Sequence, residues 1–397
     1  MSSAANHPAR AAARTPHILL VANSLEGGGA ERVMSDMANF WAGKGWQVQL
    51  ATWTGPEVAD FYSLAPDIER VWLNVDTGQR APFARMRRNV ARVLKLRRLL
   101  KESRPAAVLS FIDVPNVLTI LGSLGLPVRV VVSERNDLRQ PNGRAEHAGA
   151  YPLSRPWRIL RRLVYRWADG VTALHQDAAQ WVCAECGVAA EVIPNPLREL
   201  PAASAEREAL VLGVGRLKWE KGFDLLLRAF DRVAGDFPAW RLAILGEGPD
   251  HAALCALRGQ LRSRYRIEIR APVVDVENWM ARAGLVVLPS RFEAYGNAIL
   301  ESLGMGAAVI STPCGGTPSF MKDGVNGRLV PVDDVDALAR VMAELMADPE
   351  VRRLLGQRAL KVRETNRQDL IMRRWEQCLF PDQAGSAPLP NRDGTAA

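Results

Sequence analysis

The chain has 397 residues, of which 48% are hydrophobic and 24% charged, a composition typical of a folded globular protein large enough for two domains. No stretch reaches the roughly 18 uncharged apolar residues that a membrane-spanning helix needs. The five cysteines do not form a disulfide framework, and the close pair, Cys183 and Cys186, has no second pair to complete a zinc site. The start of the chain lacks the apolar core of a secretory signal, so we expect a cytoplasmic protein.

The net charge of +8 is concentrated in the first half of the chain. Residues 1–200 contain 25 Lys and Arg against 18 Asp and Glu, whereas residues 201–397 contain 26 against 25. The segments 85–101 and 155–167 contain eight and five basic residues, apolar or aromatic residues between them, and no acid. As helices they either bind an anionic membrane surface, which would make the protein peripheral to a membrane, or pack on a sheet with solvated charges. No nucleic-acid-binding motif accompanies the charge, so we expect no nucleic acid partner.

The hydrophobic pattern alternates between strands and helices. A strand over 17–23 leads through a Gly-rich loop into a helix over 30–45, which is followed by a strand over 46–53. The alternation continues to about residue 190. Continuous apolar strands separated by helices are typical of parallel sheets covered on both faces, so we expect an α/β fold.

A segment rich in proline and small residues, 192–208, interrupts this alternation and is typical of an interdomain linker. Strands are again expected over 209–217, 240–248 and 283–290, with helices between them. Two doubly wound domains follow from this pattern. The expected division is a disordered extension over 1–15, an N-terminal domain over 16–193, a linker over 194–207, a C-terminal domain over 208–366, a helix over 367–381 that returns to the N-terminal domain, and a disordered tail over 382–397.

The loop after the first strand, NSLEGGGAER, contains three consecutive glycines, Gly27, Gly28 and Gly29. Glycines let the backbone approach a ligand closely, and the helix that follows offers unpaired N–H groups to an anion. The loop is neither a G-x-G-x-x-G dinucleotide motif nor a Walker loop. It is therefore either an anion-binding loop of another kind or a plain tight turn.

A second loop, GRLKWEKGFD, places Arg216 and Lys221 between a buried strand and a helix. Ligands of open parallel sheets bind where strands end and helices begin. A guanidinium and an ammonium five residues apart suit the two phosphates of a diphosphate. The alternative is a solvated surface loop.

The segment RFEAYGNAILESLGMG places two carboxylates, Glu293 and Glu301, among small and apolar residues. Asn297 is expected to cap the helix between them, with the backbone N–H groups of 295–298 directed at a ligand. Carboxylates at both ends accept hydrogen bonds from hydroxyls, and the amides between them donate to an anion, an arrangement that suits a sugar nucleotide. The alternative is a capping carboxylate and a buried ion pair.

Together these residues resemble glycosyltransferase family 4, the retaining two-domain enzymes also called glycosyl transferases group 1. The resemblance covers about residues 16–380 and includes the E-x7-E motif of Glu293 and Glu301, the basic pair, the Gly-rich loop, VIPNPL at the domain connection and GGTPSFMKDGVNGRLVPVDD after the motif. It implies the GT-B fold, in which two Rossmann-like, doubly wound parallel-sheet domains face each other across a cleft.

The resemblance also implies roles for single residues. Glu301 would bind the ribose hydroxyls of the nucleotide, and Glu293, Arg216 and Lys221 would act at the donor sugar and its diphosphate. Backbone at Ala271, Pro272 and Val273 would read the base. The remaining donor-binding residues would be Gly28, Gly29, Gly246, Tyr295, Gly296 and Asn297. The resemblance implies no metal ion and no cofactor. The residues agree with this, because Arg216, Lys221, the glycine amides and a helix N-terminus can neutralise the departing diphosphate.

The N-terminal domain departs from the family pattern. Many relatives have a histidine near the donor sugar, where this chain reads VVSERND. Glu134, Arg135 and Asn136 are candidates to replace it, with Asp113 nearby as a further contact to the sugar or acceptor. His175 lies at a strand-to-helix junction and is expected to be a satisfied loop residue rather than a catalyst.

The leading interpretation is a retaining hexosyltransferase that moves a hexose or N-acetylhexosamine from a nucleoside-diphosphate sugar, with a UDP-sugar favoured, to a hydroxyl of a glycan or lipid-linked saccharide. Attack on the face that the diphosphate leaves is favoured, because no carboxylate is assignable as a nucleophile. Two alternatives remain. One is a sugar-nucleotide epimerase of the same fold, and the other is a catalytically silent basic protein that binds membranes or nucleic acid.

Overall fold

The structure is a computed structural model that describes residues 15–75, 82–135, 155–202, 206–273 and 275–381, without the side chains of 82–85 and 155. The residues group by their contacts into two units, 1–131 and 132–397. The strands form one sheet of seven and one sheet of six.

The first unit alternates strands and helices as expected. Its elements are β1 (His17–Ala22), α1 (Gly29–Gly43), β2 (Gln47–Thr52), β3 (Glu69–Trp72), α2 (Pro82–Ser103), β4 (Ala107–Phe111) and α3 (Asp113–Ser123). β1 pairs in parallel with β2 and with β4, and its residues from Ile18 onward are buried. Val33, Met37 and Trp41, spaced four apart, are buried on one face of α1.

The seven-stranded sheet has the order β3-β2-β1-β4-β5-β6-β7. β5 (Arg129–Glu134) contains the boundary between the two units. The elements that follow it are α4 (Arg155–Val164), η1 (Tyr165–Trp167), β6 (Gly170–Ala173), α5 (Gln176–Cys186) and β7 (Glu191–Val192). The basic segments 85–101 and 155–167 are thus helical, as predicted.

The six-stranded sheet has the order β10-β9-β8-β11-β12-β13, and its paired strands are parallel. Its strands are β8 (Glu208–Val214), β9 (Arg241–Leu245), β10 (Ile267–Arg270), β11 (Ala283–Leu288), β12 (Val309–Ser311) and β13 (Arg328–Leu329). Neighbouring residues of one strand enter different cores: Val211 packs in one cluster, and Leu210 and Leu212 pack in another. Both faces of this sheet are therefore covered, which explains the continuous apolar runs.

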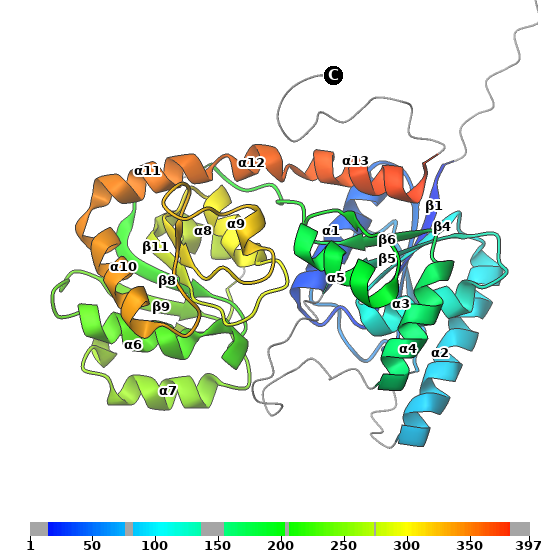
Figure 1. Cartoon of the computed structure of the whole chain (residues 1–397), viewed down its shortest axis with the longest axis horizontal. Helices are drawn as coiled ribbons and strands as arrows, with labels where there is room; N and C mark the ends of the chain where they lie inside the picture. Colours follow the sequence, from blue (N-terminus) through cyan, green and yellow to red (C-terminus); the bar gives the residue numbers. More distant parts are fainter. Residues whose placement is uncertain (1–14, 76–81, 136–154, 203–205, 274, 382–397) are drawn as a thin grey trace, which may run out of the picture. The chain divides into compact units, whose positions relative to one another are not determined.

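Helices cover the two faces of this sheet. The helices that follow β8 along the chain are α6 (Phe223–Val233), α7 (His251–Gln260), α8 (Val276–Arg282), α9 (Asn297–Gly304), α10 (Val335–Ala347), α11 (Pro349–Ala359), α12 (Val362–Thr365) and α13 (Gln368–Leu379), with short turns η2 (Trp219–Lys221), η3 (Arg264–Arg266) and η4 (Thr317–Ser319). Figure 1 shows α6 and α7 on one side of the strands and α8 and α9 on the other. Phe230 of α6 and Met342 of α10 lie in one core, and Ile299 and Leu303 of α9 lie in the other.

Two parallel sheets interleaved with helices confirm the predicted α/β class and the doubly wound arrangement. The domain boundaries, the cleft and the return of the last helix stay predictions. Within the described ranges, none of the helices combines the length and apolar character needed to cross a lipid bilayer.

Candidate active site

Two loops of the second sheet lie side by side because β8 and β11 are neighbouring parallel strands. The loop after β8 runs through Arg216 and η2 to Gly222, and α6 begins at the next residue. Gly222 has φ +67°, and a Cβ at this position would lie 2.1 Å from the carbonyl oxygen of Pro289, directly after β11. Only glycine permits this close approach of the two loops.

Arg291 fastens the same two loops together. It donates from Nη1 to the carbonyl oxygen of Trp219 at 2.9 Å and from both Nη atoms to the carboxylate of Asp224, at 2.7 and 2.8 Å. Its backbone N–H donates to the carbonyl of Glu220 at 2.8 Å, and its guanidinium lies 4.9 Å from the centre of the Trp219 ring. A guanidinium fork that pairs bidentately with a carboxylate is geometrically specific, so the loops are held in one arrangement.

Lys221 and Glu293 meet where these loops adjoin. The Nζ of Lys221 donates to Oε1 of Glu293 at 2.5 Å, and the hydroxyl of Ser290 donates to the same oxygen at 3.0 Å. In the described part of the chain, Oε2 of Glu293 has no hydrogen-bond partner. Because an ammonium has three donors, Lys221 can hold Glu293 and still donate to an anion. The structure therefore brings together two of the three residues that the resemblance places at the donor sugar and its diphosphate.

The third of those residues, Arg216, is exposed, and no described residue pairs with its guanidinium. It lies in the same loop as Lys221. Gly215 brings backbone close to the Lys221 side chain, since a Cβ there would lie 3.7 Å from Cε. Of the two cations expected at the diphosphate, Lys221 is paired to a carboxylate and Arg216 is open to a ligand.

The start of α9 differs from the prediction in one detail. The capping position is occupied by Gly296 in the left-handed conformation, with φ +89° and no side-chain cap, and Asn297 is the first helical residue. Asn297 is therefore not the cap. Its side chain accepts a hydrogen bond at 2.7 Å from Nδ2 of Asn195. The first N–H groups of the helix consequently have no capping side chain and suit an anion.

Glu301 is only 5% exposed. Nε of Arg198, in the segment between the two sheets, lies 3.8 Å from its Oε1, and Arg198 also pairs with Glu277 of α8. The carboxylate expected to bind ribose is thus close to a cation of the connecting segment. The role of Glu301 stays a prediction.

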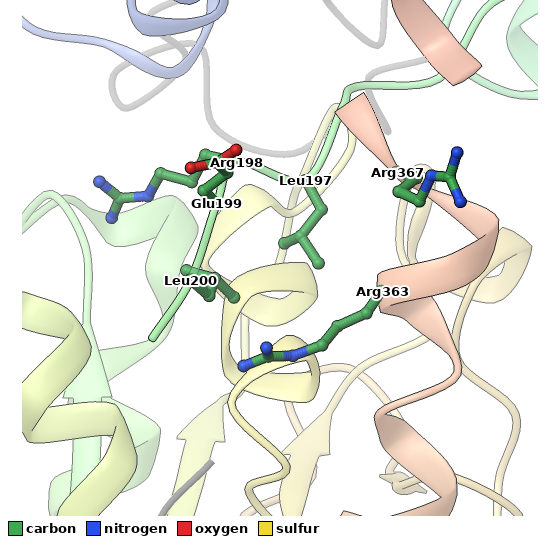
Figure 2. Close-up of a pocket in the computed structure, with 6 residues that line it drawn as sticks. All are labelled: Leu197, Arg198, Glu199, Leu200, Arg363 and Arg367. Atoms are coloured by element: carbon green, nitrogen blue, oxygen red, sulfur yellow. The ribbon is translucent and has the colours of Figure 1, made fainter. Parts of the chain in front are cut away.

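A pocket of about 300 Å³ lies beside this connecting segment. It is lined by Leu197, Arg198, Glu199, Leu200, Arg363 and Arg367 (Figure 2). Arg363 donates to the carbonyl oxygens of Gly304, at 2.6 Å, and Pro201, and Arg367 pairs with Asp369 at 2.6 Å. The pocket includes neither member of the ion pair, and its arginines already have partners.

The residues expected at the base lie at the ends of β9 and β10. Gly246 is buried, and a Cβ there would lie 1.9 Å from the carbonyl oxygen of Gly215, so glycine is required by close packing. Pro272 is exposed and Val273 is half-buried in the segment after β10. Their role in base recognition stays a prediction.

The Gly-rich loop leads into α1 as expected, with Gly28 at the capping position and Gly29 as the first helical residue. The hydroxyl of Tyr62 donates to the carbonyl oxygen of Gly28 at 3.2 Å. The carboxylate of Glu31 lies close by, since a Cβ at Gly28 would be 2.2 Å from its Oε2. An acidic side chain therefore occupies space at this helix start, and anion binding by the loop stays a prediction.

The candidates near the end of β5 are buried. Asp113, Glu134 and Arg135 are each less than 5% exposed, and the hydroxyl of Tyr165 donates to Glu134. Burial removes water from the charged guanidinium of Arg135 and so destabilises it, which lowers its pKa to about 9. Asn136 lies outside the described residues. Contacts of these residues with a sugar or acceptor stay predictions.

His175 occupies the capping position of α5. Its Nδ1 accepts a hydrogen bond from the backbone N–H of Ala178 at 3.4 Å, and its side chain is buried. This position agrees with the expectation that His175 is a loop residue whose side chain is hydrogen-bonded within the protein.

Sequence reasoning missed three residues that organise the site: Arg291, Arg198 and Asn195. Arg291 lies two residues before Glu293, the first carboxylate of the motif, and this proximity was a usable signal. Arg198 and Asn195 lie in a segment that reads as a linker, where nothing in the spacing indicates a polar contact with α9.

Two family models match the chain. The model described as glycosyl transferases group 1 matches residues 208–348, and the model described as glycosyltransferase family 4 matches residues 27–198. The chain belongs to glycosyltransferase family 4. Both sheets of this family 4 chain contribute strands to the matched ranges.

Curated relatives match over different lengths. An exopolysaccharide phosphotransferase of Streptomyces coelicolor is 31% identical over 56% of this chain but only 24% of its own length. A Campylobacter jejuni protein, named as an alpha-1,4-N-acetyl-D-galactosaminyltransferase acting on an undecaprenol-diphosphate-linked saccharide, is 27% identical over 85% of this chain and 91% of its own. The chain thus spans about a quarter of the first relative and most of the second.

Solved structures share the fold. Sucrose-phosphate synthase from Thermosynechococcus elongatus has a TM-score of 0.79 and 19% identity, covering 94% of this chain and 100% of its own. The HepE protein of Anabaena in complex with UDP-glucose has a TM-score of 0.73 and 18% identity, covering 92% and 99%. The family 4 chain therefore has the GT-B fold that the resemblance implied.

Cys314 offers a probe of the Glu293 loop. Burial, and then the negative charge of Glu293, raise the pKa of its thiol to about 11. A raised pKa means less thiolate at pH 8, and the thiolate is the form that reacts. We expect iodoacetamide to modify Cys314 at least about tenfold more slowly than the exposed Cys183 at pH 8.

Peptide mass spectrometry at intervals of one pH unit measures both rates in one sample. The rate of Cys314 modification should still be increasing with pH at pH 10. Equal rates for the two cysteines at pH 8 would contradict the raised pKa.

Proposed function

We propose that the protein is a retaining glycosyltransferase that moves a hexose or N-acetylhexosamine from a nucleoside-diphosphate sugar to a hydroxyl of a glycan or lipid-linked saccharide. The observation that carries this proposal is the Lys221–Glu293 pair at the carboxyl ends of β8 and β11. One end of this arrangement suits a sugar hydroxyl, through Oε2 of Glu293. The other suits a phosphate, through the ammonium of Lys221.

The charge of the departing diphosphate is balanced by the chain itself. Arg216, Lys221 and the first N–H groups of α9 supply positive charge and dipoles, which stabilise negative charge without a metal ion. Metal independence is part of this proposal. The exposed guanidinium of Arg216, with which no described residue pairs, supports it.

Retention follows from attack on the face that the diphosphate leaves. The bond between the anomeric carbon and the phosphate oxygen breaks, the acceptor oxygen bonds to that carbon, and the acceptor proton passes to the departing phosphate. Glu293 is held by Lys221 and Ser290 through one oxygen, an arrangement that supports sugar binding rather than nucleophilic attack.

A UDP-sugar is the favoured donor. The structural neighbour HepE was solved with UDP-glucose, and the Campylobacter relative is named for transfer to an undecaprenol-linked acceptor. These names support a UDP-sugar and a glycan or lipid-linked acceptor for this chain. The cytoplasmic location expected from the sequence stays a prediction.

Substitution of the two cations tests this function. We expect Lys221→Ala and Arg216→Ala each to lower the turnover of UDP-sugar by roughly 10²–10³, the loss seen when one preorganised donor is removed. Lys218→Ala is the matched control, because Lys218 lies in the same loop and precedes η2. Transfer is measured with a lipid-linked acceptor and with no acceptor.

Wild-type turnover in both cation variants would exclude a role of Arg216 and Lys221 in binding the diphosphate. Epimerised sugar nucleotide formed without any acceptor would indicate the epimerase. Failure of the wild type to bind UDP-sugars and GDP-sugars would indicate a catalytically silent protein.

We also propose that α2 binds an anionic membrane surface. Met86, Val90 and Leu94, four residues apart, are 58%, 56% and 61% exposed and form an apolar stripe on this helix. Eight Lys and Arg accompany the stripe between residues 85 and 101. Ile159, Leu163 and Trp167 form an exposed stripe with the same spacing along α4 and η1. Apolar residues flanked by cations suit insertion among anionic headgroups.

A charge change on the α2 stripe tests this surface. We expect Val90→Glu with Leu94→Glu to reduce co-sedimentation with vesicles rich in anionic phospholipid by about tenfold or more, because both apolar insertion and net positive charge fall. The control is Val351→Glu with Leu354→Glu, two exposed apolar residues three positions apart on α11. Equal losses in both double variants would rule out a specific role of α2.

A further inference from the structure

Three polar side chains form a line that ends at the start of α9. Arg135, at the end of β5, donates from Nη1 to Oδ1 of Asn195, and Nδ2 of Asn195 donates to Oδ1 of Asn297 at 2.7 Å. Arg135 and Asn195 are buried, and Asn297 is half-buried. None of these bonds was expected from the sequence.

The guanidinium sets the direction of the first bond. Arg135 also donates from Nε to the hydroxyl of Ser133 at 3.0 Å, and its guanidinium lies 5.3 Å from the centre of the Trp375 ring. A guanidinium has donors only, so the atom of Asn195 that faces it must be the oxygen. The carboxamide of Asn195 is therefore fixed in one of its two orientations.

This direction passes to Asn297. Because the oxygen of Asn195 faces Arg135, its NH₂ group faces Asn297, which must then present its own oxygen. The NH₂ group of Asn297 is left with two donors, and the described residues supply no acceptor for them. A carboxamide at the first position of α9 thus carries donors of fixed orientation.

The backbone of Asn195 is fixed separately from its side chain. Nδ2 of Asn366 donates to the hydroxyl of Tyr295 at 2.9 Å and to the carbonyl oxygen of Asn195 at 3.3 Å. The N–H of Leu197 donates to the carbonyl oxygen of Asn366 at 2.7 Å. The side chain of Asn195 can therefore be changed without releasing the segment that holds it.

We propose that the NH₂ group of Asn297 donates to a diphosphate oxygen of the bound donor, and that Arg135 and Asn195 are positioning residues that set its direction. This inference rests on the proposed function. A diphosphate oxygen only accepts hydrogen bonds, so a carboxamide turned the other way would present one oxygen to another. The hydrogen bonds from Arg135 through Asn195 to Asn297, which we call the relay, exclude that orientation before the donor binds.

Asn195→Asp separates direction from packing. The new carboxylate still accepts from Arg135 but has no donor for Asn297, whose carboxamide then turns its NH₂ group toward residue 195 and its oxygen toward the diphosphate. We expect the dissociation constant of UDP to rise by about 10–100-fold. Uridine, which lacks phosphates, should bind unchanged, and the melting temperature should not fall.

A second variant distinguishes a relay from a structural role. In the Asn297→Ala background there is no carboxamide to turn, so adding Asn195→Asp should weaken UDP binding by less than about twofold. Asn278→Asp, the same chemical change at an exposed position of α8, is the matched control and should bind as the wild type does. Isothermal titration calorimetry with UDP measures each variant, and competition with UDP measures uridine.

Wild-type UDP affinity in Asn195→Asp would overturn the relay. It would also be overturned if Asn195→Asp lowered UDP affinity equally in the wild type and in Asn297→Ala. An equal loss for uridine would also overturn it. In these cases weaker UDP binding by Lys221→Ala would leave the proposed function standing. A wild type that binds neither UDP nor GDP would overturn the proposed function and the relay together.

Discussion

A carboxylate whose side chain is only 12% exposed needs compensation for its lost hydration, and Glu293 obtains it from Lys221 and Ser290. The parallel sheet makes this possible, because β8 and β11 are neighbours and their carboxyl ends open onto adjoining loops. Gly222 allows those loops to touch, and Arg291 prevents them from separating. The position of the ion pair therefore depends on features of the backbone as well as on its own attraction.

The pair also reconciles two demands of the proposed chemistry. A bare carboxylate beside a diphosphate would repel it, whereas an ammonium shared between the two attracts both. The start of α9 adds N–H groups that no side chain caps, since Gly296 occupies the capping position. In the proposed reaction Lys221 and these N–H groups stabilise the negative charge that develops on the diphosphate, and Glu293 holds Lys221 in place before the donor arrives.

Local patterns in the sequence revealed the strands, the helices and the loops that contain Arg216, Lys221 and Glu293. Strand-to-helix periodicity is short-range, so one sequence was sufficient to recognise it. The contact of Lys221 with Glu293, 72 residues apart, depends on strand order, which periodicity does not specify. The cap at α9 was assigned to Asn297 because asparagine is a common cap, but the preceding glycine takes the left-handed conformation and displaces it. Asn195 escaped notice because a polar residue between prolines reads as linker.

The central claim is that Lys221 and Glu293 act as one unit. A double-mutant cycle in kcat/KM for a UDP-sugar, with Lys221→Ala, Glu293→Gln and the two combined, measures their coupling directly. If the two residues act as one unit, kcat/KM of the double variant should be at least about fivefold higher than the value expected from multiplying the two single losses. This difference corresponds to a coupling of about 1 kcal/mol or more. Losses that multiply within experimental error would contradict it.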